Sequence, residues 1–200
     1  MKLKNLNFLS PVLFIGLLSF SIKNEIENCF TTFNKASNLE MASPERLPET
    51  SEKFRTVKTF KGEVDISRID GYRILYNNKK QVPFVNLKVE QSKHDSYAVD
   101  TLNIIENLKY LNSSSPMETK DILESNYNGY KIYGLSRNTI ESGSILGIFA
   151  IFPGNDITLY VYFNNLKPEF RNFENLEDYK KQRDKFLQEY TSYLKSCLTK

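Results

Sequence analysis

The sequence contains one histidine, two cysteines and no tryptophan in 200 residues. The single histidine excludes metal sites that need two or more histidines, including the His-Glu-x-x-His helix of zinc proteases. A Ser-His-Asp or Cys-His catalytic site would have to use His94. That residue lies in a polar run, residues 91–95, directly before a predicted helix, which is typical of a surface loop. We therefore predict no catalytic residue and no metal ligand.

Glycine is also scarce, with eight residues. Gly143 and Gly147 do not form a phosphate-binding loop, because no Gly-Lys-Ser/Thr sequence follows them. Residues 65–71 loosely resemble the start of a calcium loop, but Asp70 stands where that loop needs glycine and Tyr76 where it needs glutamate. We expect a polar turn between strands at 65–71, and the sequence predicts no cofactor.

Neither sign of charge dominates. The chain has 27 basic and 24 acidic side chains, but Lys2 and Lys4 lie in the first 21 residues, which hold no acidic residue. Without that segment the balance is 25 basic against 24 acidic side chains. A nearly neutral chain lacks the broad basic surface on which nucleic-acid binding depends. The charge balance therefore predicts that nucleic acid is not a partner.

Long apolar runs are absent except near Met1. Two lysines precede a mostly apolar run, residues 6–20, and the small residues Ser19 and Ser21 occupy the two positions that a signal peptidase reads. The run of about 15 residues is short for a membrane-spanning helix. We predict a signal peptide over residues 1–21, a periplasmic or secreted location, and no membrane span after cleavage. The alternatives are a buried core helix and an uncleaved anchor.

The two cysteines lie near opposite ends of the predicted mature chain. Cys29 and Cys197 both fall on apolar stripes of predicted helices, so both thiols should point inward. An even number of cysteines in an oxidising compartment favours a disulfide. The alternative is two free thiols, one in a flexible tail and one on a helix.

The remaining pattern divides the chain into two parts. It predicts a short helix and a linker rich in Ser, Glu and Pro over residues 22–55, the linker beginning at residue 37, and one folded domain over 56–200. The expected elements of this domain are, in order, strands at 56–61, 72–76 and 82–90, a helix at 96–111, strands at 121–127, 130–135, 144–152 and 157–163, and a helix at 176–198. This order indicates an α+β fold, with a central antiparallel sheet of about five to seven strands covered by helices and a long C-terminal helix.

Several of these elements have distinctive patterns. Asn128-Gly129 is the strongest short hairpin signal. Strands 144–152 and 157–163 are apolar on both faces, which predicts a central position in the sheet. In the first of these strands, alternation places one apolar set on each face, Leu146, Ile148, Ala150 and Phe152 opposite Ile145, Phe149 and Ile151.

The two long helices have one expected buried stripe each. The mid-chain helix should bury Ala98, Leu102, Ile105 and Leu108. Asn175 is the expected N-cap of the closing helix. The stripe of that helix is Tyr179, Phe186, Tyr190, Leu194 and Cys197. Arg183 lies at the flank of this stripe, where we expect a buried stem and a head group in water.

The domain resembles a known superfamily. The segments that carry the resemblance are Asn128-Gly-Tyr-Lys-Ile-Tyr-Gly134, Gly147-Ile-Phe-Ala-Ile-Phe152, Ile157-Thr-Leu-Tyr-Val-Tyr-Phe163 and Asp184-Lys-Phe-Leu-Gln-Glu-Tyr190. In element order and apolar pattern, residues 56–198 look like the Mog1/PsbP-like superfamily. The resemblance implies an α/β/α sandwich.

The resemblance also implies a role. Members of that superfamily are small exported or lipid-anchored bacterial proteins, extrinsic lumenal subunits of photosystem II, and a nuclear factor that binds a small GTPase. Most are not enzymes, which implies a binding or accessory role here. None of their functional residues corresponds to a position in this chain, so no partner follows from the resemblance.

Tyrosines supply the candidate site. Tyr160 and Tyr162 share one face of a central strand with Thr158 and Asn164. If that face is partly open, the two rings form an amphipathic binding platform for a peptide or glycan. The alternative is that the mid-chain helix covers them.

We therefore predict an exported, non-enzymatic binding or accessory protein with an unknown protein or glycan partner. The alternative function is an exported hydrolase that uses carboxylates in a cleft between sheet and helices. That alternative requires two carboxylates on strand ends that face one pocket. A flat, exposed aromatic patch would favour the binding function.

Overall fold

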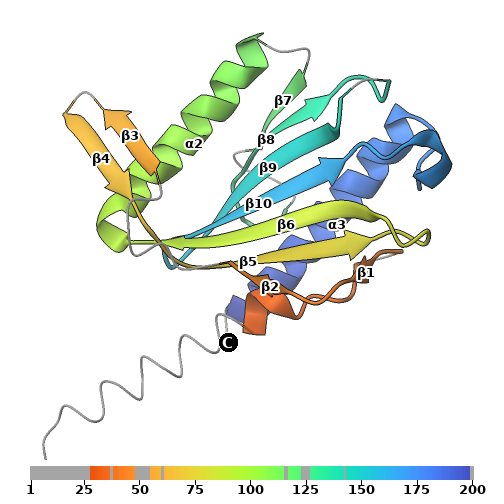
Figure 1. Ribbon diagram of the computed structural model, residues 1–200, viewed down its shortest axis with the longest axis horizontal. Coiled ribbons are helices and arrows are strands. Elements are labelled where there is room, and N and C mark those ends of the chain that lie inside the picture. Colours follow the sequence, from red (N-terminus) through yellow and green to blue (C-terminus); the bar gives the residue numbers. More distant parts are fainter. Residues whose placement is uncertain are drawn as a thin grey trace, which may run out of the picture.

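The computed structural model describes residues 28–36, 38–47, 55–59, 61–114, 117–122, 127–141 and 143–198. These residues hold an eight-stranded sheet in the order β1-β5-β6-β10-β9-β8-β7, with β2 also paired to β5 (Figure 1). Every pairing between neighbouring strands is antiparallel. The strands of this sheet are β1 Glu40–Met41, β2 Glu45–Arg46, β5 Arg68–Asn77, β6 Pro83–Ser92, β7 Met117–Ile122, β8 Ile132–Arg137, β9 Ile145–Gly154 and β10 Ile157–Asn164.

Two further strands and the helices complete the described part of the chain. β3 Arg55–Thr59 and β4 Gly62–Ile66 form a separate hairpin that projects beside α2 (Figure 1). The helices are a short turn at residues 28–31, α2 His94–Ser114, the 3₁₀ turn η1 Pro168–Phe170 and α3 Leu176–Leu198. An antiparallel sheet with a long C-terminal helix confirms the α+β class.

The β9–β10 hairpin lies at the centre of the sheet, as its apolar faces predict. Asn155 and Asp156 connect the two strands with φ of 53° and 60°. A two-residue turn with positive φ at both positions matches the right-handed twist of the strands that it joins.

One face assignment in β9 is wrong. The sequence placed Leu146 on the face of Ile148, Ala150 and Phe152, but Leu146 packs with Phe149 in the core on the opposite face. The pairing of β9 with β10 shifts register between Phe163 and Asn164, which bulges β9 at this point. Strict alternation does not foresee a bulge, because one extra residue reverses the faces on its far side.

α3 packs against one face of the sheet and passes behind it in Figure 1. Its bounds match the prediction, and the N–H of Asp178 donates to Oδ1 of Asn175 at 3.0 Å, which confirms the N-cap. The prediction for Arg183 is wrong, because this side chain is fully buried. Its Nη1 donates to Ser136 Oγ in β8 at 2.7 Å, so a polar partner inside the core replaces water.

α2 packs against the opposite face, where Ile104 and Leu108 meet Leu135 and Ala150. The helix exists as predicted, but its buried stripe differs: Leu102 is 62% exposed. The buried row has a spacing of four residues and consists of Ser96, Asp100, Ile104 and Leu108. Apolar spacing alone did not identify this row, because half of its members are polar.

Three loop predictions also need correction. Residues 65–71, expected to be a turn, belong largely to β4 and β5, and Ile66 is fully buried. Residues 38–47, expected to be linker, carry β1 and β2. Asn128 and Gly129 do form a turn, with φ of 61° and 88°, but the strands that flank it pair first at Ile122 and Ile132. Residues 48–54 of the expected linker lie outside the described residues, as does the predicted signal peptide.

Candidate functional site

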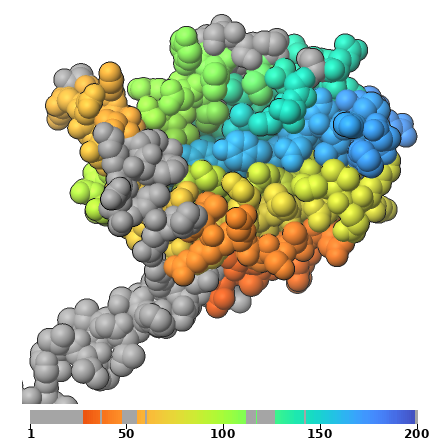
Figure 2. Space-filling view, in the orientation of Figure 1, coloured from red at the N-terminus to blue at the C-terminus, as the bar shows by residue number. Residues whose placement is uncertain are grey.

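A groove lies beside α2 on the sheet face opposite α3. Figure 2 shows this face, where the surfaces of β10, β6 and β5 are visible next to the green surface of α2. The groove has a volume of about 280 Å³. Its lining residues come from α2, β9 and β10, and they are Asn103, Ile104, Asn107, Leu108, Leu111, Ile148, Ala150, Tyr160 and Tyr162. The groove is therefore mostly apolar, with phenol and amide groups as its polar members.

Both predicted platform residues line this groove. Tyr160 and Tyr162 are half-buried, so α2 neither covers them fully nor leaves them fully open. Their rings are stacked, with centroids 6.3 Å apart and an interplanar angle of 20°. Lys88 of β6 places its Nζ 5.6 Å from the centroid of the Tyr160 ring, within cation–π distance.

Two buried polar atoms lie on the same face. Thr158 shares the face of Tyr160 along β10, and Asn86 pairs with Tyr162 across the β6–β10 ladder. Thr158 Oγ1 and Asn86 Oδ1 are buried and have no hydrogen-bond partner among the described residues. An unsatisfied buried oxygen is unfavourable by about 1–3 kcal/mol. These two atoms therefore favour a ligand or water that supplies hydrogen bonds at this face.

The carboxylates near this face are ion-paired. Glu90 is buried and accepts from Arg68 Nη1 at 3.0 Å, and Lys88 Nζ lies 2.8 Å from the same carboxylate. Asp70, which shares the face of Tyr72 on the α3 side of the sheet, is also buried and is paired with Arg46 at 3.2 Å. Sequence reasoning missed these pairs, because the partners come from strands that the sequence assigned to a turn and a linker.

His94 is exposed, as predicted, but lies on the first turn of α2 rather than in a loop. Its Nδ1 lies 3.0 Å from the carboxylate of Asp156 in the β9–β10 turn. The contact joins the start of α2 to the central hairpin. His94 precedes the groove-lining residues of α2, which begin at Asn103, by more than two helical turns.

A second polar cluster is buried under α3. Arg183 donates from Nε to Asp184 at 2.8 Å, and Ser136 Oγ lies 3.2 Å from the hydroxyl of Tyr179. Burial raises the pKa of Tyr179 to about 12, although Ser136 and Arg183 both act to lower it. Tyr127 donates to the same Asp184 carboxylate at 3.1 Å, and burial raises its pKa too. The cluster joins α3 to the sheet and holds a buried arginine that the sequence did not reveal.

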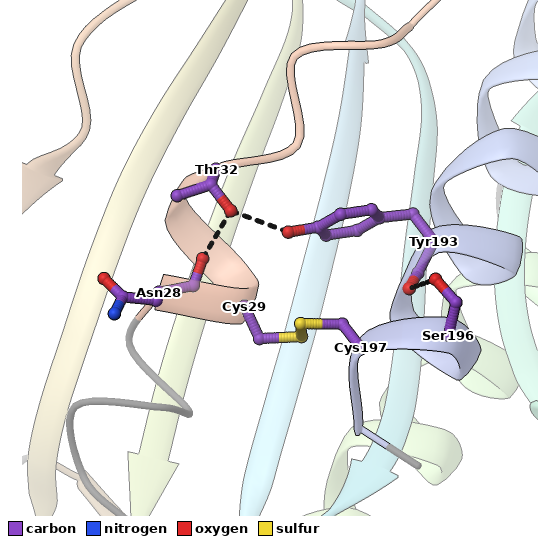
Figure 3. Close-up of a disulfide and its surroundings, with 6 residues drawn as sticks. All are labelled: Asn28, Cys29, Thr32, Tyr193, Ser196 and Cys197. Atoms are coloured by element: carbon purple, nitrogen blue, oxygen red, sulfur yellow. Dashed lines mark hydrogen bonds between the residues drawn. A yellow bond between two sulfur atoms is a disulfide. The ribbon is translucent and has the colours of Figure 1, made fainter. Parts of the chain in front are cut away.

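Cys29 and Cys197 are joined in a disulfide, with Cα atoms 5.8 Å apart (Figure 3). Cys29 belongs to the helical turn at residues 28–31, and Cys197 lies in the last turn of α3. Directly after that turn, Thr32 forms a 2.7 Å hydrogen bond with Tyr193 of α3 (Figure 3). The platform and the disulfide are separate features, because no groove-lining residue belongs to either of these two elements.

Across the described ranges, no group of three or more His, Cys, Asp or Glu side chains is arranged to hold a metal ion. No helix in that same part of the chain is both long and apolar enough to cross a membrane.

Comparison with known proteins returned no relative. No protein-family model, curated protein sequence or solved structure matches the chain. The resemblance to the Mog1/PsbP-like superfamily therefore stays a prediction. Inference about function rests on the geometry of the groove and its surroundings.

Proposed function

We propose that this chain is an exported binding or accessory protein, and that its groove takes an apolar segment of a protein partner. The observation that carries the proposal is the groove itself, an open apolar trough between α2 and β10 with a tyrosine pair in its lining. A mostly apolar groove with a few polar groups in its lining is the usual form of a binding site. Aromatic residues in such a position combine a large apolar contact area with a polar hydroxyl.

The lining favours a peptide segment over a glycan. A sugar ring binds best to a free aromatic face, but the rings of Tyr160 and Tyr162 are stacked on each other. Lys88 lies over the Tyr160 ring as well. The remaining surface is largely aliphatic, with Ile104 and Ile148 among the lining residues. Aliphatic surface binds apolar side chains by excluding water.

The hydrolase alternative requires two carboxylates that face one pocket. The lining residues of the groove instead contribute amides, phenols and aliphatic groups. Glu90, the buried carboxylate on this face, is paired with Arg68 and Lys88. These pairings support a binding role over a hydrolytic one.

Export and the finer fold belong to the same proposal. A disulfide between Cys29 and Cys197 suits an oxidising compartment. The position of α2 and α3 on opposite sheet faces supports an α/β/α sandwich like that of the Mog1/PsbP-like superfamily. The signal pattern at residues 1–21 supports a periplasmic or secreted location.

Site-specific crosslinking tests the proposal. A benzophenone amino acid is placed at Asn107 in the groove, and at Lys181 on the exposed side of α3 as the control. The full chain is expressed in its own host and irradiated, and the adducts are identified by mass spectrometry. We expect a protein adduct from Asn107 and none from Lys181, with an apolar peptide at the crosslinked position.

A matched pair of charge variants makes this result specific. Leu111 lines the groove and is 44% exposed, whereas its neighbour Tyr110 is 69% exposed and does not line it. Leu111→Lys should abolish the Asn107 adduct, and Tyr110→Lys should preserve it. An adduct with carbohydrate, or one that survives Leu111→Lys, would contradict a peptide in the groove.

A further inference from the structure

The outer edge of β5 is covered by a segment that we call the strap, residues 28–36 and 38–47. In Figure 1 the strap, coloured red to orange, runs along the outer side of β5. Its second half holds β1 and β2, which are two residues long each and both pair with β5. Its first half packs into the core through Phe30 and Phe33, both buried.

The second half of the strap attaches weakly. β1 and β2 are separated by residues 42–44, which include Pro44, a residue without a backbone N–H to donate. Beyond the two short ladders, the N–H of Ala42 donates to Leu75 O and that of Leu47 to Gly71 O, each at 2.8 Å. Two ion pairs also join β2 to β5, Arg46 with Asp70 and Glu45 with Arg73. Leu47 is the one buried apolar residue among positions 38–47, with Leu39 and Met41 partly buried against the core. Short edge pairings of this kind belong to the parts of a protein that open first.

The first half attaches strongly at the end of α3. The Phe33 ring lies 5.2 Å from that of Tyr190 and 5.1 Å from that of Tyr193. Next to these contacts, the disulfide fixes Cys29 to Cys197 (Figure 3). The covalent bond therefore fixes the start of the strap to α3 and limits how far the second half can move away from β5.

We propose that the Cys29–Cys197 disulfide is a redox-sensitive latch, and that its reduction by a dithiol lets the strap open and expose the edge of β5. This inference does not depend on the groove, which is lined by α2, β9 and β10 on the sheet face opposite α3. Cys197 is half-buried and Cys29 is 2% exposed, so the attacking thiolate reaches the sulfur of Cys197 first.

The chemistry is thiol–disulfide exchange. A thiolate of the dithiol attacks Cys197 Sγ, forms a mixed disulfide and releases Cys29 as a thiolate, which takes up a proton. The second thiol of the reductant then attacks its own sulfur in the mixed disulfide and releases Cys197. The dithiol is oxidised by two electrons to an intramolecular disulfide, and the protein disulfide is reduced to two thiols.

Opening leaves the rest of the sheet intact, because β5, β6, β10, β9, β8 and β7 pair with one another without the strap. β5 is ten residues long, so its free edge is a row of unpaired backbone groups. Such an edge accepts an extended strand from another chain. The oxidised protein hides this edge, and the reduced protein presents it.

Hydrogen–deuterium exchange of the full chain tests the latch. The oxidised protein is compared with protein treated with dithiothreitol, without denaturant, and with the Cys29→Ser/Cys197→Ser variant. A disulfide typically contributes about 2–4 kcal/mol. The exchange rates of amides in β1, β2 and the outer edge of β5 should therefore rise about 30- to 700-fold on reduction. Amides of β9 and β10 should be unchanged.

Three results would overturn the latch. The first is no faster exchange in β1 and β2 after reduction. The second is equally faster exchange in β9 and β10, which would make the disulfide a support of the whole fold. The third is thiols that dithiothreitol generates only in denaturant, since a latch has to be reachable in the folded protein. Dithiothreitol added to the serine variant should change nothing, and near-ultraviolet circular dichroism checks that this variant folds.

Discussion

Arg183 in α3 donates from Nη1 to Ser136 Oγ in β8 at 2.7 Å, with both residues fully buried. A buried cation thus depends on one small hydroxyl for part of its solvation. Ser136→Ala should lower the free energy of unfolding by about 1–3 kcal/mol, because it leaves a buried donor without its partner.

A double-mutant cycle checks this dependence. Arg183→Met removes the donor and keeps most of the packing volume, so Ser136→Ala should destabilise the Arg183→Met background less than the native protein. Urea unfolding of the four proteins gives the coupling energy. Additive effects of the two substitutions would show that the hydrogen bond contributes nothing to stability.

Truncation of the tyrosine pair should separate binding from stability. Tyr162→Ala should reduce stability by less than about 2 kcal/mol, since the side chain is half-buried. Tyr190→Ala removes a fully buried ring and should reduce it by about 3–5 kcal/mol. Denaturant unfolding measures both, and crosslinking at Asn107 should fall with Tyr162→Ala. A loss of stability as large as that of Tyr190→Ala would mean that Tyr162 is a core residue.

Stability should fall in alkaline solution. Burial raises the pKa of Tyr179 to about 12, whereas an unfolded tyrosine titrates near pH 10. The unfolded chain therefore loses its proton first, so the stabilisation is complete below about pH 10 and is lost as pH rises toward about 12. Burial raises the pKa values of Tyr127 and Tyr190 in the same direction.

Urea unfolding at about pH 8 and about pH 11 measures this loss. Tyr179→Phe should show a smaller decrease between the two conditions, because its phenol no longer titrates. An equal decrease in the variant would assign the alkaline loss to the other buried tyrosines.

Gly147 in β9 should not tolerate a side chain. A Cβ at this position would lie 2.5 Å from the Tyr179 hydroxyl and 2.8 Å from the Phe149 ring. Gly147→Ala should therefore destabilise the protein by about 1–3 kcal/mol through overpacking. Ser144→Ala, at an exposed position just before β9, is the control and should change stability by less than about 0.5 kcal/mol. Thermal unfolding followed by circular dichroism compares the two.

The mature chain should begin near Ile22. The two lysines, the apolar run at residues 6–20 and the Ser19–Ser21 positions predict cleavage there. N-terminal sequencing of exported protein measures the start directly. A sequence that begins at Met1 would favour the uncleaved anchor.

The elements that sequence reasoning placed well carry their own local signals. α3 has an N-cap at Asn175 and a buried stripe that repeats along its length, so its bounds and the aromatic part of its buried face were predicted. The β9–β10 hairpin has two strands apolar on both faces and a polar turn between them. Such signals are local and do not depend on distant parts of the chain.

The elements that were missed depend on contacts between distant segments. β1 and β2 form only because β5 offers an edge, and nothing in Glu45–Arg46 indicates a strand. Arg183 was expected to reach water, because a helix pattern does not show that Ser136 faces it from a strand 47 positions earlier. The platform at Tyr160 and Tyr162 was proposed from alternation along one strand, but its groove needs Leu111 from another element.

The sequence separation of the latch also sets an order of assembly. Cys29 emerges from the ribosome 168 residues before Cys197, so the disulfide cannot close until synthesis of α3 is nearly finished. Contacts of such high sequence separation form late, because the intervening loop has to be ordered first. The strap is thus the first described segment to be synthesised and the last to gain its covalent bond. During that interval the newly made chain has no disulfide to hold the strap against β5.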